Sequence, residues 1–412
     1  MTATSDRDDE VFARLARAGH RQGLALDGAR IRRTSSRFCL GIEHGDYNGT
    51  ELFGVGTDRF LWLAYAPNGR RTLRLFSANY PASGVVELEP GQVPAPGSIQ
   101  GWARYPAGVL AILQREGFTL RRGLDVALFG DIPGGGMSRS ASLCINLILS
   151  LLDANEIAVE QPFRVAELAQ AVENDYVGSP CGLLDQVMIL FARAGQGTRF
   201  DPVSRSVTQV PLGATAPDFR LLALDTGVAR EGLERSTYAA RRRECQELLA
   251  LLSAAGFDLP NLAAVRDEAT KAAIDARFRS SHPAHLARLD YLFAAQRRFP
   301  AMLAAWQRGD AAAIGASFRA DGHGLRDDYR ISGPELETMC DLVRPVPGVL
   351  GERMLGGGDA GTAGAIVLAD AVAAVRDAVA IGYPRSRPRA AAGHAVHELR
   401  LVDGVTRLAR RL

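Results

Sequence analysis

Three short polar segments of the sequence could together bind a small molecule. In the first, residues 37–49, Glu43, His44 and Asp46 stand within four positions, ahead of an Asn-Gly turn. Each carboxylate can accept two hydroxyl protons and an imidazole can accept or donate, so the trio suits a polyhydroxylated ligand. A solvated turn is the ordinary alternative for charged residues at such a place. A metal site is also conceivable, but one histidine with two carboxylates indicates it only weakly.

The second segment is a glycine-rich turn at residues 133–142, which precedes an apolar run. Glycine lets the backbone approach an anion closely, and the amides and dipole of a following helix attract it, so the pattern is typical of a phosphate site. The hydroxyls of Ser138 and Ser140 strengthen this interpretation because they could bond phosphate or magnesium. A tight turn without a ligand is the alternative.

The third segment, residues 173–186, contains two carboxylates separated by a turn. Glu173 stands at the end of an expected helix, and Pro180-Cys-Gly182 predicts a turn before Asp185 begins another apolar stretch. Asp185 beside an apolar run could be a buried carboxylate with a chemical role. It could equally be a helix N-cap, a position that aspartate often fills.

The lysine content excludes several enzyme classes. The 412 residues include 48 basic side chains, of which Lys271 is the single lysine. A Walker A loop, a protein kinase and a pyridoxal enzyme each need a lysine in a defined motif. Lys271 stands in Ala-Thr-Lys-Ala-Ala, which contains none of those motifs.

Length and composition indicate an ordinary globular protein. A chain of 412 residues usually forms two domains of roughly 100–200 residues each, and we expect them at residues 1–215 and 216–412. A net charge of +2 argues against a nucleic-acid partner. No apolar run is long enough to span a membrane, and the acidic start does not resemble a secretory signal. Five scattered cysteines favour a reducing cytoplasm, and we expect a monomer or weak oligomer.

Apolar spacing predicts the elements that carry these segments. We expect helices over residues 9–23, 102–117 and 162–176, a further helix after the glycine-rich turn, and long helices from residue 226 to about 319. Strands and hairpins are expected over 31–80, with further strands at 124–128, 195–200, 207–210 and 219–224 and a short one at the end. A last glycine cluster lies at 351–364.

Six landmarks in order make the sequence resemble the galactokinase branch of the galactokinase, homoserine, mevalonate and phosphomevalonate (GHMP) kinases. The resemblance covers about residues 30–382. The landmarks lie at residues 37–49, 133–141, 181–186, 236–245, 325–336 and 351–358. The resemblance implies an α+β fold in two lobes, an N-terminal mixed sheet with helices and a C-terminal ferredoxin-like α/β sandwich, with the active site in the cleft between them.

The resemblance also implies ATP-dependent phosphorylation of a sugar at its anomeric hydroxyl, galactose or a close relative. Asp185 would accept the hydroxyl proton, and Arg37 would hold Asp185 ionised while steadying the phosphoryl group. Ser140 and Glu173 would bind Mg²⁺. The residues that would bind the sugar are Glu43, His44, Asp46, Gly182 and Tyr238. Those that would bind ATP are Pro133, Gly134, Gly135, Gly136, Ser138, Arg139 and Ser140. The match of Glu43 and His44 favours a hexose over a pentose.

Several positions depart from the family pattern and leave other functions open. The departures are Cys39, Gly41-Ile42, Gly45, Arg139 and Asp359-Ala360. Changes near residues 39–45 could reshape the pocket for an amino, N-acetyl, deoxy or uronic sugar. Arg139 and Asp359 could instead mark a sugar- and ATP-binding regulator without turnover, although such a regulator has no need to retain both Arg37 and Asp185.

Overall fold

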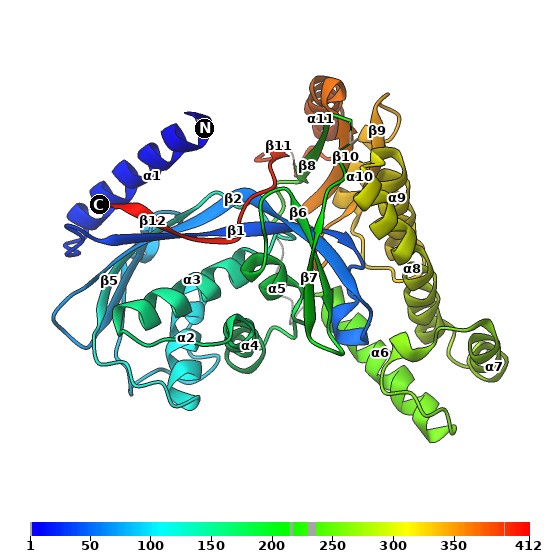
Figure 1. Cartoon of the computed structure of the whole chain (residues 1–412), viewed down its shortest axis with the longest axis horizontal. Coiled ribbons are helices and arrows are strands. Elements are labelled where there is room, and N and C mark those ends of the chain that lie inside the picture. The colour runs from blue at the N-terminus through cyan, green and yellow to red at the C-terminus, as the bar shows by residue number, and fades with distance from the viewer. Residues whose placement is uncertain (1, 215–216, 230–235, 391) are drawn as a thin grey trace.

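The computed structural model describes residues 2–214, 217–229, 236–390 and 392–412. These residues form two β-sheets with helices packed against both (Figure 1). The α+β class and the two-lobed arrangement expected from the sequence are therefore confirmed.

The first sheet is built mainly from the N-terminal half. Its strands are β1 (Arg30–Gly41), β2 (Leu52–Pro67), β3 (Leu73–Ser77), β4 (Val85–Leu88), β5 (Leu124–Gly130), β6 (Gln196–Asp201), β7 (Ser206–Pro211) and β12 (Val405–Arg411). Within the described residues the order is β12-β1-β2-β5-β3-β4, with β6 on β2 and β7 on β6. The pair β3 and β5 is parallel, and the other pairs are antiparallel, so the sheet is mixed as expected.

Strand β2 is buried on both faces because helices cover both sides of the sheet. Successive side chains of a strand point to opposite faces. Leu61, Leu63 and Tyr65 therefore join the main core, while Phe60 and Trp62 join a second cluster. Helix α1 (Thr2–Arg21) forms this second cluster, on the opposite side of the sheet from α2 (Arg104–Arg115) and α3 (Arg139–Ala154) (Figure 1). Helices were expected at all three places.

The second sheet and the longest helices come from the C-terminal half. The strands are β8 (Phe219–Asp225), β9 (Val349–Met354), β10 (Thr362–Leu368) and β11 (Ala395–Leu399). In the described residues they form an antiparallel sheet in the order β11-β8-β10-β9. The helices are α6 (Thr237–Ala254), α7 (Glu268–Phe278), α8 (Pro283–Arg308), α9 (Ala311–Asp327), α10 (Pro334–Val343) and α11 (Val372–Ser386).

The chain crosses between the two sheets twice. The expected domain boundary at residues 215 and 216 lies outside the described residues, between β7 and β8, and it stays a prediction. Near the C-terminus the chain crosses back, because β11 pairs with β8 whereas β12 pairs with β1. The segment between β11 and β12 thus connects the second sheet to the first.

Ion pairs are made almost entirely by arginine. The ammonium of Lys271, which is buried on α7, lies 2.6 Å from Asp275 and 2.6 Å from Asp290. Apart from the pair His285–Glu247, the other ion pairs of the described residues use arginine. None of the helices in these residues combines the length and the apolar character needed to cross a bilayer.

Candidate active site

A cavity of about 740 Å³ brings the three polar segments together. Its walls come from β1 and the turn after it, from the glycine-rich turn before α3, and from the chain between α4 (Pro162–Ala171) and α5 (Leu184–Leu190). Tyr238 and Gly356 close it from the C-terminal half. Among the described residues, the lining includes every site residue expected from the sequence except Pro133.

Arg37 and Asp185, which both line this cavity, form an ion pair. Strand β1 carries Arg37, whose side chain is 2% exposed, and the first turn of α5 carries Asp185, which is 27% exposed. Arg37 donates to Oδ1 of Asp185 through Nε at 2.8 Å and through Nη2 at 2.7 Å. Arg37 Nη1 also donates to the carbonyl of Gly136 at 2.7 Å, which ties the pair to the glycine-rich turn. No described residue donates to Oδ2 of Asp185, so that oxygen can take a proton from a ligand.

Asp46 and Gly182 are in direct contact in the wall of the cavity. The carboxylate of Asp46 accepts hydrogen bonds from the amides of Leu184 and Tyr47, each at 3.0 Å. Burial raises the pKa of Asp46 to about 6 because desolvation opposes its charge. A Cβ atom on Gly182 would stand only 2.0 Å from Oδ2 of Asp46, so the close approach requires glycine there.

His44 belongs to a cluster of aromatic side chains that reaches into the C-terminal half. Its Nδ1 lies 3.0 Å from the hydroxyl of Tyr47, which in turn lies 2.8 Å from the hydroxyl of Tyr329. The ring centroid of His44 is 5.2 Å from that of Tyr238 on α6. A buried polar network of this kind holds the imidazole in one orientation.

Glu43 lines the cavity, but its carboxylate is occupied by protein donors. Oε2 accepts from Nη1 of Arg353 at 2.9 Å, and Oε1 accepts from the amide of Gly356 at 3.0 Å. Oε1 also lies 3.4 Å from Nη2 of Arg37. The sequence suggested Glu43 as a direct sugar ligand, and that contact stays a prediction. In the structure its carboxylate lies between two buried arginines.

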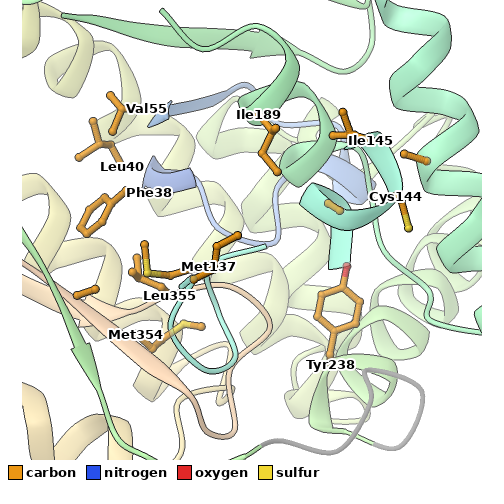
Figure 2. Packing of buried hydrophobic residues seen from close by; sticks show 14 of the residues in the cluster. Phe38, Leu40, Val55, Met137, Cys144, Ile145, Ile189, Tyr238, Met354 and Leu355 are labelled. Carbon is orange, nitrogen blue, oxygen red and sulfur yellow. The ribbon is translucent and has the colours of Figure 1, made fainter. Parts of the chain in front are cut away.

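The glycine-rich turn is packed against a second glycine-rich turn from the C-terminal half. A Cβ atom on Gly136, whose φ is 100°, would stand 2.6 Å from the carbonyl oxygen of Leu355. Figure 2 shows Met137 and Leu355, one from each turn, in the same buried cluster as Phe38. Glycine is required where the two backbones touch.

Two side chains at the start of α3, those of Ser138 and Arg139, differ in their hydrogen bonds. Ser138 precedes α3 with a φ of 62°, and its buried hydroxyl has no hydrogen-bond partner among the described residues. Such an orphaned polar group suits a ligand that supplies the missing bond. Arg139 folds back along the turn, and its Nε donates to the carbonyl of Ile132 at 3.2 Å.

Ser140 and Glu173 provide oxygen atoms for a cation next to this turn. Glu173 lies in a π-helical turn, η4 (Val172–Val177), that follows α4, and Ser140 hydrogen-bonds to it. Burial raises the pKa of Glu173 to about 7, and Oε2 accepts from Gln186 Nε2 at 2.8 Å. The described residues contain no cluster of three or more His, Cys, Asp or Glu side chains that could hold a metal. A hydroxyl and a carboxylate nevertheless fit Mg²⁺, which usually takes its other ligands from phosphate and water.

One wall of the cavity was not assigned from the sequence. Beside the glycine-rich turn the lining includes Asn79, Tyr80, Trp102, Tyr105 and Leu128. The stretch around Trp102 was interpreted only as the start of a helix. Its aromatic residues were the available signal, but aromatic residues at the start of a helix are more often core than ligand contacts.

Comparisons with known proteins agree with this geometry. Residues 104–193 match the family of the GHMP kinases N terminal domain. The chain is 36% identical over 341 residues to the galactokinase of Streptomyces coelicolor, covering 82% of this chain and 84% of that protein. It is 33% identical over 358 residues to the galactokinase of Chloroflexus aurantiacus, covering 86% and 88%.

Solved structures give the same result. The crystal structure of Lactococcus lactis galactokinase complexed with galactose has a TM-score of 0.86 at 26% identity, covering 96% of this chain and 99% of that one. The mevalonate kinase of Methanococcus jannaschii has a TM-score of 0.64 at 13% identity, covering 90% and 98%. The second likeness concerns the fold alone.

Proposed function

This chain belongs to the galactokinase family, and we propose that it transfers the γ-phosphoryl group of ATP to the anomeric hydroxyl of galactose. The observation that carries the proposal is the Arg37–Asp185 pair, which stands in one cavity with the glycine-rich turn. A carboxylate next to a phosphate site is the arrangement that phosphorylation of a hydroxyl requires.

Asp185 is the proposed general base. Oδ2 of Asp185 takes the proton from the C1 hydroxyl of the sugar while the hydroxyl oxygen attacks the γ-phosphorus of ATP. The bond between the γ-phosphorus and the bridging oxygen breaks, and ADP leaves with its electron pair. Arg37 fixes Asp185 through Oδ1, and its positive charge next to the proposed base would balance the negative charge that develops during transfer. In-line positioning of the two substrates contributes much of the rate.

The glycine-rich turn is the proposed site of the ATP phosphates, with Pro133 at its start. The amides of the turn and the unpartnered hydroxyl of Ser138 supply donors for phosphate oxygens. Ser140 and Glu173 would hold Mg²⁺, which neutralises negative charge on the phosphates when it is bound. The aromatic wall around Trp102 lies next to the turn and suits the adenine base.

Asp46, His44, Gly182 and Tyr238 are the proposed sugar contacts. They line the same cavity as Asp185, where the Asp46 carboxylate can accept hydrogen bonds from sugar hydroxyls. We further propose that the enzyme works in the cytoplasm. Each of the five cysteines is free and buried in the structure, as suits a reducing compartment.

The departures from the family pattern support an ordinary hexose rather than a modified sugar. Cys39, Gly41 and Gly45 are absent from the cavity lining of the described residues. A Cβ atom on Gly45 would stand 1.9 Å from the hydroxyl of Thr50, so glycine there serves the packing of the turn. These positions therefore do not enlarge the pocket for a substituent.

The other two departures have structural partners of their own. Arg139 braces the glycine-rich turn through Ile132, and Asp359 accepts from the amide of Thr237 at 2.7 Å, next to Tyr238. Neither contact interferes with Arg37 and Asp185. We therefore favour an active kinase over a regulator without turnover.

The proposal is tested by incubating the protein with ATP, Mg²⁺ and a panel of aldohexoses while ADP release is measured. We expect turnover with galactose, and a phosphorus NMR signal of a sugar 1-phosphate. Asp185→Asn should lower kcat by roughly 10²–10⁴-fold, as for a general base. Absence of turnover with every aldohexose would refute the kinase, and calorimetric binding of both ligands without ADP release would indicate the regulator instead.

A further inference from the structure

Arg353, at the C-terminal end of β9, is a completely buried cation that contacts the opposite half of the molecule. Its Nη1 donates to Oε2 of Glu43 and its Nη2 to the carbonyl of Cys39, each at 2.9 Å. Its Nε lies 3.5 Å from Oδ2 of Asp321, and its guanidinium lies 4.4 Å from the ring centroid of Phe318. A buried charge is tolerated only where opposite charges and hydrogen bonds surround it.

Through Glu43 these contacts reach the proposed catalytic pair. Nη2 of Arg37 lies 3.4 Å from Oε1 of Glu43 and 2.7 Å from Oδ1 of Asp185. Two carboxylates therefore compete for one guanidinium, and Asp185 has the closer contact. Glu43 attracts the guanidinium of Arg37 less strongly because each of its carboxylate oxygens already accepts a hydrogen bond, one from Arg353 and one from the amide of Gly356.

We propose that Arg353 is a positioning residue for phosphoryl transfer: it holds the charge of Glu43, so that Arg37 remains bonded to Asp185. Glu43 then acts through Arg37 rather than as an acceptor of sugar hydroxyls. This inference rests on the proposed function, because it concerns the geometry of the proposed base.

Loss of the Arg353 charge has a defined geometric consequence. Glu43 would be left in a buried site with Arg37 as its nearest cation. Closing the 3.4 Å separation to an ordinary ion-pair length of about 2.8 Å moves Nη2 of Arg37 by roughly 0.6 Å, away from Asp185. The base loses its alignment while the sugar contacts of Asp46 and Tyr238 stay in place, so kcat falls and the KM for galactose does not.

The experiment compares three variants of the full chain by kcat per folded molecule and by KM for galactose. Arg353→Met removes the charge and keeps an apolar chain of similar length. Glu43→Gln/Arg353→Met removes both partners, so that no negative charge competes for Arg37. Arg344→Met is the matched control, because Arg344 Nε donates at 2.7 Å to Glu352, a fully buried carboxylate next to Arg353 on β9.

We expect kcat of Arg353→Met to fall by roughly 10²-fold with the KM for galactose changed less than about threefold. The double variant should recover to within roughly tenfold of the wild type, a rescue that loss of an ordinary structural contact does not give. Arg344→Met should lose stability but keep its kcat per folded molecule. If Arg353→Met does not fold, the test depends on the double variant. The inference then still requires that the kcat of the double variant lies within about tenfold of the wild-type kcat.

Other outcomes overturn the inference. A wild type that phosphorylates galactose together with an Arg353→Met enzyme of unchanged kcat refutes the positioning role and leaves the proposed function standing. A double variant whose KM for galactose rises more than about tenfold identifies Glu43 as a direct sugar ligand instead. Wild-type protein without turnover on any aldohexose refutes the proposed function, and this inference with it.

Discussion

Gly182→Ala tests the sugar side of the cavity with a single methyl group. The added Cβ would stand 2.0 Å from Oδ2, 2.2 Å from Cγ and 2.7 Å from Oδ1 of Asp46, where real contacts stay above 3.0 Å. The carboxylate must therefore move by roughly 1 Å, which breaks its hydrogen bond from the amide of Leu184. A bond to a charged group contributes about 1.5–3 kcal/mol.

A displacement of about 1 Å in a positioning group lowers reactivity by up to 10²-fold. We therefore expect kcat/KM for galactose to fall roughly 10²-fold, which corresponds to about 2.7 kcal/mol. The KM for ATP should stay within about threefold, because the glycine-rich turn is untouched. Initial rates with each substrate varied in turn, together with thermal unfolding, give both quantities.

Gly178→Ala is the matched control in the same segment. Gly178 has a φ of 80°, and a Cβ atom there meets nothing within 4 Å. Alanine in this left-handed conformation lowers the free energy of unfolding by about 1–2 kcal/mol. Its methyl group does not touch Asp46. An equal loss of kcat/KM in both variants would assign the effect to the stability of the segment. Retention of wild-type kcat/KM in Gly182→Ala would refute the contact between Asp46 and the sugar.

Four further outcomes are expected. The KM for galactose should rise as the pH falls through about 6, because the pKa of Asp46 is raised to about 6 by burial and the protonated form loses an acceptor; rates measured from pH 5 to 8 show this. Asp359→Ala should lower the free energy of unfolding by about 1 kcal/mol and raise the KM for galactose modestly, since it leaves the amide of Thr237, the first residue of α6, without its acceptor. Arg139→Ser should raise the KM for ATP about three- to tenfold, because it releases the brace on Ile132. Chelation of Mg²⁺ should abolish ADP release while galactose binding by calorimetry persists.

The sequence allowed the local parts of the site to be predicted. The apolar run after the glycine-rich turn predicts α3, and the three polar segments carry recognisable motifs, so their residues could be named before the fold was known. The structure then places these segments around one cavity. Local spacing is enough for such predictions because a helix and the turn before it depend mainly on neighbouring residues.

The contacts that Arg353 and Tyr329 make near the site could not be predicted. Arg353 is 310 positions from Glu43 and Tyr329 is 282 positions from Tyr47, and nothing in local periodicity links either pair. The helix expected over 162–176 also changes character, since α4 ends at Ala171 and a π-helical turn follows with Glu173 in it. Such turns often occur at functional sites and have no clear sequence signal.

The nearly lysine-free ion pairs affect how the protein should respond to alkali. A lysine side chain loses its charge near pH 10.4, whereas arginine stays protonated beyond about pH 12. Arginine pairs over the described surface therefore survive alkaline titration that would neutralise lysine pairs. The exception is the Arg7–Asp131 pair, because burial lowers the pKa of Arg7 to about 10. Lys271, which lies buried between Asp275 and Asp290, is the single lysine of the sequence. Amine-directed acylation would likewise find no exposed lysine side chain, so such reagents should leave the residues that line the cavity unmodified.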